Sequence, residues 1–457
     1  MHRIRRQILD LELPREAGAV ALQRQVARVF QEKVLPKLDE VFSKIAPADR
    51  IIRIDRLEID LGVFGETNWE RNFVERCVEQ VTRQVTEVAF ETAPAPEVNA
   101  QRLDPEENAL AIFQIFLETG ALPWYARGLS LKTLEGYVLQ MAATRPAVLQ
   151  QALLSVLQRE EAVLRRLFWQ FSPDFSEKTL EVALGLAPGW VAHAVQILQS
   201  RAARILDVAQ RVGLFKTLIT AVITGAFRQT PQPELLTQLY FQTETAPKPE
   251  LSGNRRPEAE TGIPDTQPKP AGAPEQMQPE NKRGKTNFPP EGIMADNAGV
   301  VLLGVYLPAF FQELKLVEAG AFATPDHQFR AIHLIHYLAT GLENPEEPAL
   351  VLPKLLCGLN LEEPVPAELA LSETEKNEGT DLLKAVIQNW PVLKNTSPDG
   401  LRGGFLQRMG HLSRSESQSA WLLRLERLGQ DMLLERLPWS ISVIKLPWME
   451  EAVQVEW

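Results

Sequence analysis

The sequence is poor in the residues that form disulfide frameworks and metal centres. Its 457 residues include two cysteines and six histidines. Cys77 and Cys357 stand far apart in apolar, helix-like surroundings, which favours two buried thiols over a disulfide or a reactive nucleophile. His333 and His336, with His327 upstream, form a histidine cluster, but no carboxylate or cysteine completes it at metal-binding spacing. We therefore expect no metal site and partly exposed histidines on a helix.

A basic segment and a long apolar run are also missing. The net charge is −11, whereas a nucleic-acid-binding domain usually carries a basic stripe. The basic cluster His2–Arg6 leads into an alternating segment, which favours a solvated strand start over phosphate contacts. The apolar run Ala298–Phe311 contains Pro308 and is shorter than the about 20 residues that span a bilayer, so we expect a buried core segment. The N-terminal charges precede no apolar stretch, so we expect no signal peptide.

Catalytic signatures are absent as well. Gly400–Gly404 is rich in glycine, but it follows a serine-capped helix start and lacks the Lys-Ser/Thr of a phosphate-binding loop. The sequence contains no Gly-x-Ser-x-Gly, no Cys/His pairing and no paired acids in a recognisable frame. We predict a protein that is not an enzyme, has no cofactor, binds no nucleic acid and does not insert into a membrane.

The sequence does contain enough apolar residues for several cores. Hydrophobic residues make up 45% and charged residues 23% of the chain, as in globular proteins, and the length suggests about three domains. We expect a mainly helical α+β protein with small β contributions. The predicted parts are a β-α-β-α module at 1–92, a central helical region at 103–243, a proline-rich disordered linker at 244–296 and a mostly helical domain at 297–457 that ends in short strands.

In the N-terminal module, alternating residues predict strands and amphipathic stretches predict helices. Leu9–Leu13 is expected to be one strand, and residues 52–61 another, with a bulge where the alternation slips by one residue. Helices are expected at Ala17–Ser43, with a kink or break at Pro36, and at Trp69–Ala89. Two strands are not stable alone, so the helices must cover them.

The central region is marked by helix boundaries. Asp104-Pro105 offers an N-cap and a proline at the first helical position, and Gly120 ends the same helix. Short connections with Pro or Gly predict antiparallel neighbours, and the lack of a fixed period favours a bundle over a regular solenoid. Further helices are expected at Leu131–Ala142, Pro146–Gln158, Glu161–Gln170, Ser176–Leu186, Trp190–Ala209 and Leu214–Phe227. The linker beyond them has few large apolar side chains and cannot bury enough surface to fold.

The C-terminal domain has helical stretches and then a change of period. Apolar residues at helical spacing predict a helix at Asp381–Trp390, and Ser397-Pro398 starts another. A longer helix is predicted at Ser417–Leu437. Beyond it, alternating apolar residues predict two short strands, at 441–446 and 453–457. An end this apolar should be held in the fold rather than frayed.

Two predicted helices end in the same short pattern. Phe116–Gly120 and Tyr337–Gly341 both close an apolar stretch with Leu-x-Thr-Gly, where glycine supplies the left-handed residue of a helix C-cap. Chance or shared capping chemistry is the favoured explanation, and an internal duplication is the alternative.

Three tryptophans directly follow a proline. Each proline ends an element, and the indole either packs into a corner of the core or anchors a protein partner, a role in which tryptophan is favoured. With side chains from the terminal segments, these tryptophans form the candidate interaction set. Its members are Trp124, Arg402, Arg408, Trp439, Trp448 and Trp457.

Several long motifs resemble a known family. They are Ser397–Arg408 (Ser-Pro-Asp-Gly-Leu-Arg-Gly-Gly-Phe-Leu-Gln-Arg), Leu437–Trp448 (Leu-Pro-Trp-Ser-Ile-Ser-Val-Ile-Lys-Leu-Pro-Trp) and the closing Val455–Trp457, continued upstream by Val351–Leu359, Ala331–Gly341 and Ile8–Gly62. This set is similar to the tape-measure proteins of contractile injection systems. These systems are phage-tail-like particles, and the family is thought to set the length of the inner tube. The motifs are structural in type, and the middle of the chain matches only in its helical character.

The resemblance implies a structural assembly protein. We predict a tape measure that helps to set inner tube and sheath length through contacts with tube, baseplate or spike components, first in the cytoplasm and then within the particle. One continuous helix of the whole chain would extend roughly 690 Å, but recurrent prolines and apolar clusters argue against that form. The ruler is then the middle region with the linker, or the ends are anchors. The alternative is a helical adaptor or chaperone-like scaffold that serves assembly or cargo without measuring.

Overall fold

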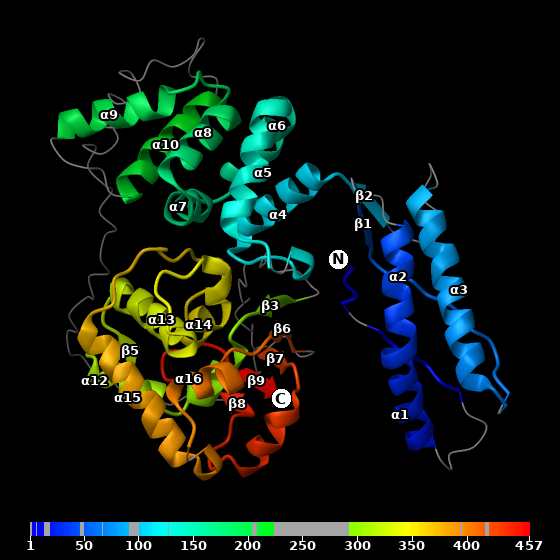
Figure 1. Ribbon diagram of the computed structural model, residues 1–457. Coiled ribbons are helices and arrows are strands. Elements are labelled where there is room, and N and C mark those ends of the chain that lie inside the picture. Colours follow the sequence, from blue (N-terminus) through cyan, green and yellow to red (C-terminus); the bar gives the residue numbers. More distant parts are fainter. Residues whose placement is uncertain are drawn as a thin grey trace, which may run out of the picture.

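The described residues form three apolar cores in a mainly helical chain. The computed structural model describes residues 2–5, 7–12, 19–45, 50–65, 67–90, 100–126, 128–202, 208–223, 292–393, 395–415 and 420–457. Helices predominate over small sheets, so the predicted fold class is confirmed. We call the three parts the N-terminal layer, the central helices and the C-terminal unit, each with its own cluster of buried residues. Figure 1 shows the central helices above the C-terminal unit, with the N-terminal layer beside them.

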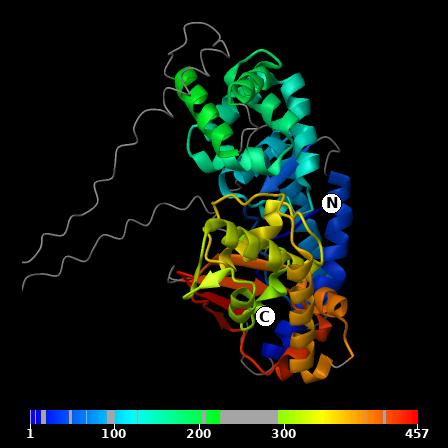
Figure 2. The same cartoon turned by 90° about the vertical axis from the view of Figure 1, so that its left-hand side faces the viewer.

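The N-terminal layer is built from two helical stretches that pack side by side and run in the same direction (Figure 1). Its elements are α1 (Ala19–Val29), the π-helical turn η1 (Phe30–Val34), α2 (Leu35–Ile45) and α3 (Trp69–Phe90). The predicted interruption at Pro36 takes the form of η1, because a proline cannot donate the helical hydrogen bond and its ring crowds the preceding turn. Figure 2, turned by 90°, places this layer at the height of the C-terminal unit.

The predicted β-α-β-α arrangement of this layer is wrong. Strand β1 (Ile51–Ile54) pairs antiparallel with β2 (Ala100–Leu103), which was not predicted. Neither residues 7–12 nor residues 55–61 form a strand. Leu57, Ile59 and Leu61 still pack against the apolar cluster of the layer. Alternating apolar residues show only that one side of a segment is buried. Here the helices bury that side, and no neighbouring strand forms the hydrogen bonds that would make the segment a strand.

The central helices begin with a well-capped element. Asp104 caps α4 (Pro105–Thr119) by accepting from Glu107 N at 2.8 Å, and Gly120 ends it at φ 70°, so both predicted boundaries are confirmed. The other elements are η2 (Trp124–Ala126), α5 (Leu131–Thr144), α6 (Pro146–Leu157), α7 (Glu161–Gln170), α8 (Pro173–Leu184), α9 (Trp190–Ala202) and α10 (Val208–Ile223). Helices distant in order pack together, α6 on α8 and α7 on α10, as in a bundle.

The C-terminal unit wraps helices around one sheet. Its helical elements are η3 (Ala298–Leu303), α12 (Leu307–Glu313), α13 (Pro325–Thr340), η4 (Glu347–Leu350), α14 (Val351–Leu356), α15 (Glu373–Asn389), η5 (Pro391–Leu393), α16 (Pro398–Leu401), the π-helical η6 (Arg402–Leu406) and η7 (Gly429–Arg436). The run 298–311 is largely buried, as predicted. Ser397 caps α16 through Gly400 N at 3.0 Å, which confirms that helix start.

The sheet holds the C-terminus near its centre. Its order is β3 (Ile293–Ala295), β6 (Gly410–Arg414), β7 (Trp421–Leu425), β9 (Val453–Glu456) and β8 (Val443–Ile444), and β4 (Val317–Glu318) pairs separately with β5 (Ala321–Phe322). Strand β9 runs parallel to β7 and antiparallel to β8. The two terminal strands predicted from alternation are therefore confirmed.

Two predictions fail in this unit. The helix predicted at Ser417–Leu437 is wrong for its first half, where Trp421–Leu425 forms strand β7 between β6 and β9, with alternate side chains buried. Within its second half, Gly429–Arg436 forms the 3-10 helix η7. Most of the predicted linker 244–296 lies outside the described residues. Its last part is ordered, because Ile293–Ala295 pairs with β6.

Among the described residues, none of the helices combines the length and the apolarity that crossing a bilayer requires. Cys77 and Cys357 are both free and buried, as predicted. Burial raises the pKa of the Cys77 thiol to about 11 and that of Cys357 well above its usual value.

Candidate functional site

The contact between the central helices and the C-terminal unit is centred on three buried charged side chains. Arg166 on α7, Glu347 in η4 and Lys354 on α14 are 0%, 0% and 1% exposed. Arg166 Nε donates to Glu347 Oε2 at 3.0 Å, and Lys354 Nζ donates to Oε1 of the same carboxylate. We call these three residues the buried charge cluster. One carboxylate thus joins cations from two parts of the chain.

Backbone carbonyls accept from further donors of the two cations. Arg166 donates to the carbonyls of Leu117 and Glu362, and Lys354 Nζ donates to Leu361 O at 3.2 Å. Burying an ion costs several kcal/mol unless opposite charge and acceptors surround it. The acceptors come from both sides of the contact, so the cluster is satisfied only when the two parts are docked.

Further contacts surround this cluster. Gln170 accepts from Glu347 N at 3.0 Å and donates to Val365 O at 2.6 Å. Ala121, just beyond the end of α4, belongs to the apolar core of the C-terminal unit. Arg165 pairs with Glu363 at 2.7 Å. The central helices therefore bind the C-terminal unit through these polar contacts, together with the apolar contact of Ala121.

Burial controls the ionisation of Lys354. Removal from water lowers the pKa of its ammonium to about 8, although Glu347 acts in the opposite direction. A lysine with a lowered pKa can act as a base or nucleophile when a substrate reaches it. Lys354 is enclosed and already bonded to Glu347 and Leu361, so the geometry supports a joint between two parts and not a reaction centre.

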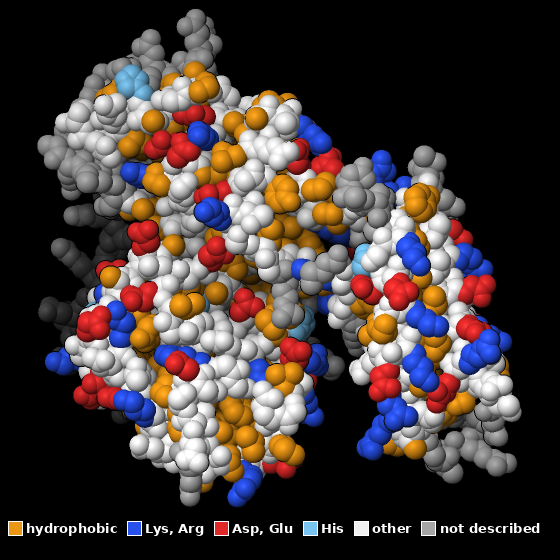
Figure 3. All heavy atoms as spheres, viewed as in Figure 1, with side chains coloured by type: hydrophobic (Ala, Val, Ile, Leu, Met, Phe, Trp, Pro, Cys, Tyr) orange, Lys and Arg blue, Asp and Glu red, His pale blue; other side chains and the backbone are white. Residues whose placement is uncertain are grey.

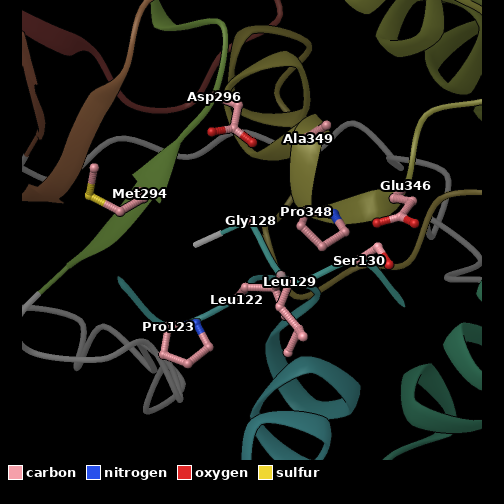
Figure 4. Close-up of a pocket in the computed structure, with 10 residues that line it drawn as sticks. All are labelled: Leu122, Pro123, Gly128, Leu129, Ser130, Met294, Asp296, Glu346, Pro348 and Ala349. Carbon is pink, nitrogen blue, oxygen red and sulfur yellow. The ribbon is translucent and has the colours of Figure 1, made fainter. Parts of the chain in front are cut away.

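A surface cavity of about 280 Å³ lies beside this contact. It is lined by Leu122, Pro123, Gly128, Leu129, Ser130, Met294, Asp296, Glu346, Pro348 and Ala349. Figure 4 shows its two carboxylates, Asp296 and Glu346, on either side of Pro348 rather than facing each other. Glu346 accepts from Leu131 N at 3.2 Å and so caps the start of α5. The Ser130 hydroxyl of this lining is hydrogen-bonded to Thr133 Oγ1 at 2.9 Å rather than to a carboxylate.

The histidine pair of α13 lies in the core, so the predicted partial exposure is wrong. His333 and His336 are 2% and 6% exposed, and His333 Nε2 lies 2.8 Å from Pro366 O. Burial lowers the pKa of His333, and burial with the nearby His333 lowers the pKa of His336 to about 4. Within the described parts of the chain, no group of three His, Cys, Asp or Glu residues is placed to hold a metal ion.

The indoles of the candidate interaction set reach into the fold. Trp439 Nε1 donates to Leu302 O at 3.1 Å, and Trp448 Nε1 donates to Leu356 O at 2.8 Å. Both are half-buried against the C-terminal core. Trp124 is half-buried in η2, edge-on to Tyr125. These contacts fit a corner role, while a role in partner binding stays a prediction.

Arg402, Arg408 and Trp457 have defined structural contacts. Arg402 donates to Leu338 O at 3.1 Å at the end of α13. Arg408 Nη2 and Trp457 Nε1 both donate to Asp431, at 2.7 and 3.1 Å. Asp431 in η7 thus links the terminal tryptophan to Arg408, which lies just before β6. The structure does not bring the six candidates together, since Trp124 lies in η2 and the other five in the C-terminal unit.

The sequence analysis missed the buried charge cluster. Lys354 stands alone in the apolar stretch Val351–Leu356, and a single charge with apolar neighbours on all sides is a signal for a buried ion. Its partner is not visible in the same way, because Arg166 and Glu347 are 181 residues apart. On the face shown in Figure 3, positive and negative side chains are interspersed, without a stripe of one sign.

Comparison with known proteins gives a match over the full chain. The model of a family described as contractile injection system tape measure protein matches residues 1–457. No curated protein and no solved structure matches. The match includes all three apolar cores, both sides of the buried charge cluster and the C-terminal sheet.

Proposed function

Because the chain belongs to the family of contractile injection system tape measure proteins, we propose that it is an assembly protein that helps to set the length of the inner tube and sheath. It acts through contacts with tube, baseplate or spike components, in the cytoplasm during assembly and within the particle afterwards. The single observation that carries this proposal is the family match over the whole chain.

The dimensions of the fold bear on which segment measures. The longest helical stretch of the described residues, formed by α1, η1 and α2 over residues 19–45, spans about 40 Å at about 1.5 Å per residue. A folded unit of this kind is too short to follow a long tube. The segment 224–291 connects α10 to β3 and would reach about 220 Å when fully extended at about 3.3 Å per residue. We propose that this segment contributes the measured length and that the three folded parts bind the particle.

A second candidate is a helical adaptor or chaperone-like scaffold. The observation that favours it is the docking of the central helices onto the C-terminal unit through the buried charge cluster. A chain that stays in this compact form has a binding surface and no extended ruler.

The test is a series of particles with altered segments. Insertions and deletions of 20 residues are placed between 244 and 291, and tube length is measured by electron microscopy. A ruler predicts a change of roughly 30–70 Å for each 20 residues, between helical and extended rise. The control replaces the same number of residues with a different sequence and should leave length unchanged. Unchanged length with fewer particles across the series would support the adaptor instead.

A further inference from the structure

Two helices in different parts of the chain begin and end with the same kinds of residue. Helix α4 begins after Asp104 with a proline, and α13 begins after Thr324 with a proline. Both close with Leu-x-Thr-Gly, and the terminal glycines have nearly the same backbone, φ 70° and ψ 6° at Gly120 and φ 73° and ψ 7° at Gly341. The weak sequence similarity thus corresponds to a repeated local structure.

The threonine of each motif makes the same two hydrogen bonds. Thr119 Oγ1 donates to Ile115 O at 2.7 Å and accepts from Ala121 N at 3.2 Å. Thr340 Oγ1 donates to His336 O at 2.9 Å and accepts from Leu342 N at 3.1 Å. In both places the hydroxyl joins the last turn of the helix to the residue after glycine.

An arginine completes each end by donating to the motif leucine. Arg166 Nη1 donates to Leu117 O, and Arg402 Nε donates to Leu338 O at 3.1 Å. The two arginines come from unrelated elements, α7 and η6. A cation at a helix C-terminus satisfies free carbonyls and complements the helix dipole. We call the two ends the Gly120 cap and the Gly341 cap.

The two caps differ in what covers them. At the Gly120 cap, Glu347 lies against the glycine and pairs with Arg166 Nε at 3.0 Å. At the Gly341 cap, the three atoms nearest to a Cβ built on the glycine all belong to Arg402. The next residue, Leu342, is 66% exposed. The first cap is closed by an acidic loop of the same chain, and the second is partly open, with Gly341 half-buried and the Arg402 side chain 11% exposed.

A local carboxylate takes the place of Glu347 at the partly open cap. Arg402 Nη1 donates to Asp399 Oδ1 at 2.8 Å, and the Asp399 side chain is 87% exposed. An ion pair with so exposed a member contributes little, because water and salt compete for both charges. Gly403, beside Arg402 in the chain, has open space where a side chain would be.

We propose that the Gly341 cap is a docking site for an acidic loop of a partner protein, a glutamate followed by proline. Its carboxylate displaces Asp399 from Arg402 and binds the guanidinium, as Glu347 of the loop Glu346–Pro348 binds that of Arg166. The apolar residue next to this glutamate in the partner loop covers Leu342. This proposal rests on the proposed function, since it specifies the chemistry of one contact with the particle. Charge complementarity and the closed Gly120 cap within the same chain define this partner.

The experiment uses a fluorescent peptide with the sequence of residues 344–350, Asn-Pro-Glu-Glu-Pro-Ala-Leu, and the purified full-length chain. Binding is followed by fluorescence anisotropy. Asp399→Asn removes the competing carboxylate and should tighten binding by about two- to fivefold. Asp381→Asn is the matched control, because Asp381 is 65% exposed and pairs with Lys384 three residues away at 2.7 Å. It should leave binding unchanged.

Two further changes, one in the peptide and one in the chain, should weaken or abolish binding. A peptide with glutamine in place of the second glutamate should bind at least about tenfold more weakly. Arg402→Ala should abolish binding, with folding checked by circular dichroism. Weaker or unchanged binding to Asp399→Asn, persistent binding to a folded Arg402→Ala chain, or no binding to any variant overturns the proposal. Because the assay contains no particle, its failure is separate from a failure of the tube-length series.

Discussion

A Cβ built on Gly120 would lie 2.4 Å from Oε1 of Glu347, although the two residues belong to different parts of the fold. No side chain fits between the end of α4 and this carboxylate. Glycine is required here both for its positive φ and for the space that it leaves. The close approach makes the junction between the central helices and the C-terminal unit sensitive to single substitutions.

The first prediction concerns that approach. Gly120→Ala should lower the free energy of unfolding by about 2–4 kcal/mol, from backbone strain at positive φ together with the collision with Glu347. Gly128→Ala is the matched control, because Gly128 has φ 79° and nothing within 4 Å of a built Cβ. It should cost about 1 kcal/mol. Equal losses in urea denaturation would show that the collision relaxes.

The second prediction concerns the carboxylate of the buried charge cluster. Glu347→Gln leaves Arg166 and Lys354 buried without their counterion and should cost about 3–5 kcal/mol. Glu346→Gln changes the adjacent, exposed carboxylate and should cost less than about 1 kcal/mol. Denaturant unfolding of both variants measures the difference. Similar losses would mean that water reaches the cluster.

The third prediction follows from the lowered pKa of Lys354. Its pKa is about 8 in the folded chain and 10.5 ordinarily. Between these values the unfolded chain holds the proton that the folded chain has released, so the Lys354 contribution to stability rises with pH. Glu347→Gln removes the main influences that raise this pKa. In that variant the pH range over which stability rises should therefore begin below pH 8. Stability of that variant, measured against Glu346→Gln, should rise between pH 7 and 8.

The fourth prediction concerns acid. Burial lowers the pKa of His336 from 6.5 to about 4, so the unfolded chain takes up a proton first as the pH falls. The stability that the neutral imidazole contributes is present above pH 6.5 and is lost toward pH 4. His336→Leu should flatten this loss. Ile335→Leu, at the neighbouring buried position, should retain it, and thermal unfolding at several pH values compares the three chains.

The fifth prediction concerns the C-terminus. Deleting residues 453–457 removes β9, which separates β7 from β8 in the sheet, and should unfold the C-terminal unit, detected as rapid proteolysis. Trp457→Phe keeps most of the apolar ring but loses the hydrogen bond to Asp431 and should cost about 1 kcal/mol. Glu456→Gln, at an exposed pair with Arg424, should have almost no effect. A truncated chain that resists protease would contradict this role of β9.

The sequence by itself determined the features that depend on neighbours along the chain. Asp104, Gly120 and Ser397 mark helix boundaries, because a cap needs only a side chain or a left-handed residue within one turn. The apolar run 298–311 was identifiable as core since its length and proline exclude a membrane span. The terminal motifs also indicated the family, while its partners stay a prediction.

Tertiary structure decided whatever depends on a distant partner. Trp421–Leu425 suits a helix or a strand by its pattern, and strands β6 and β9 select the strand. Residues 7–12 alternate like a strand and pair with none in the described chain. The contact of Arg166 with Glu347 joins positions 181 residues apart. Local preference is the same whether or not such partners meet, so only the packed fold could show which charges are buried together.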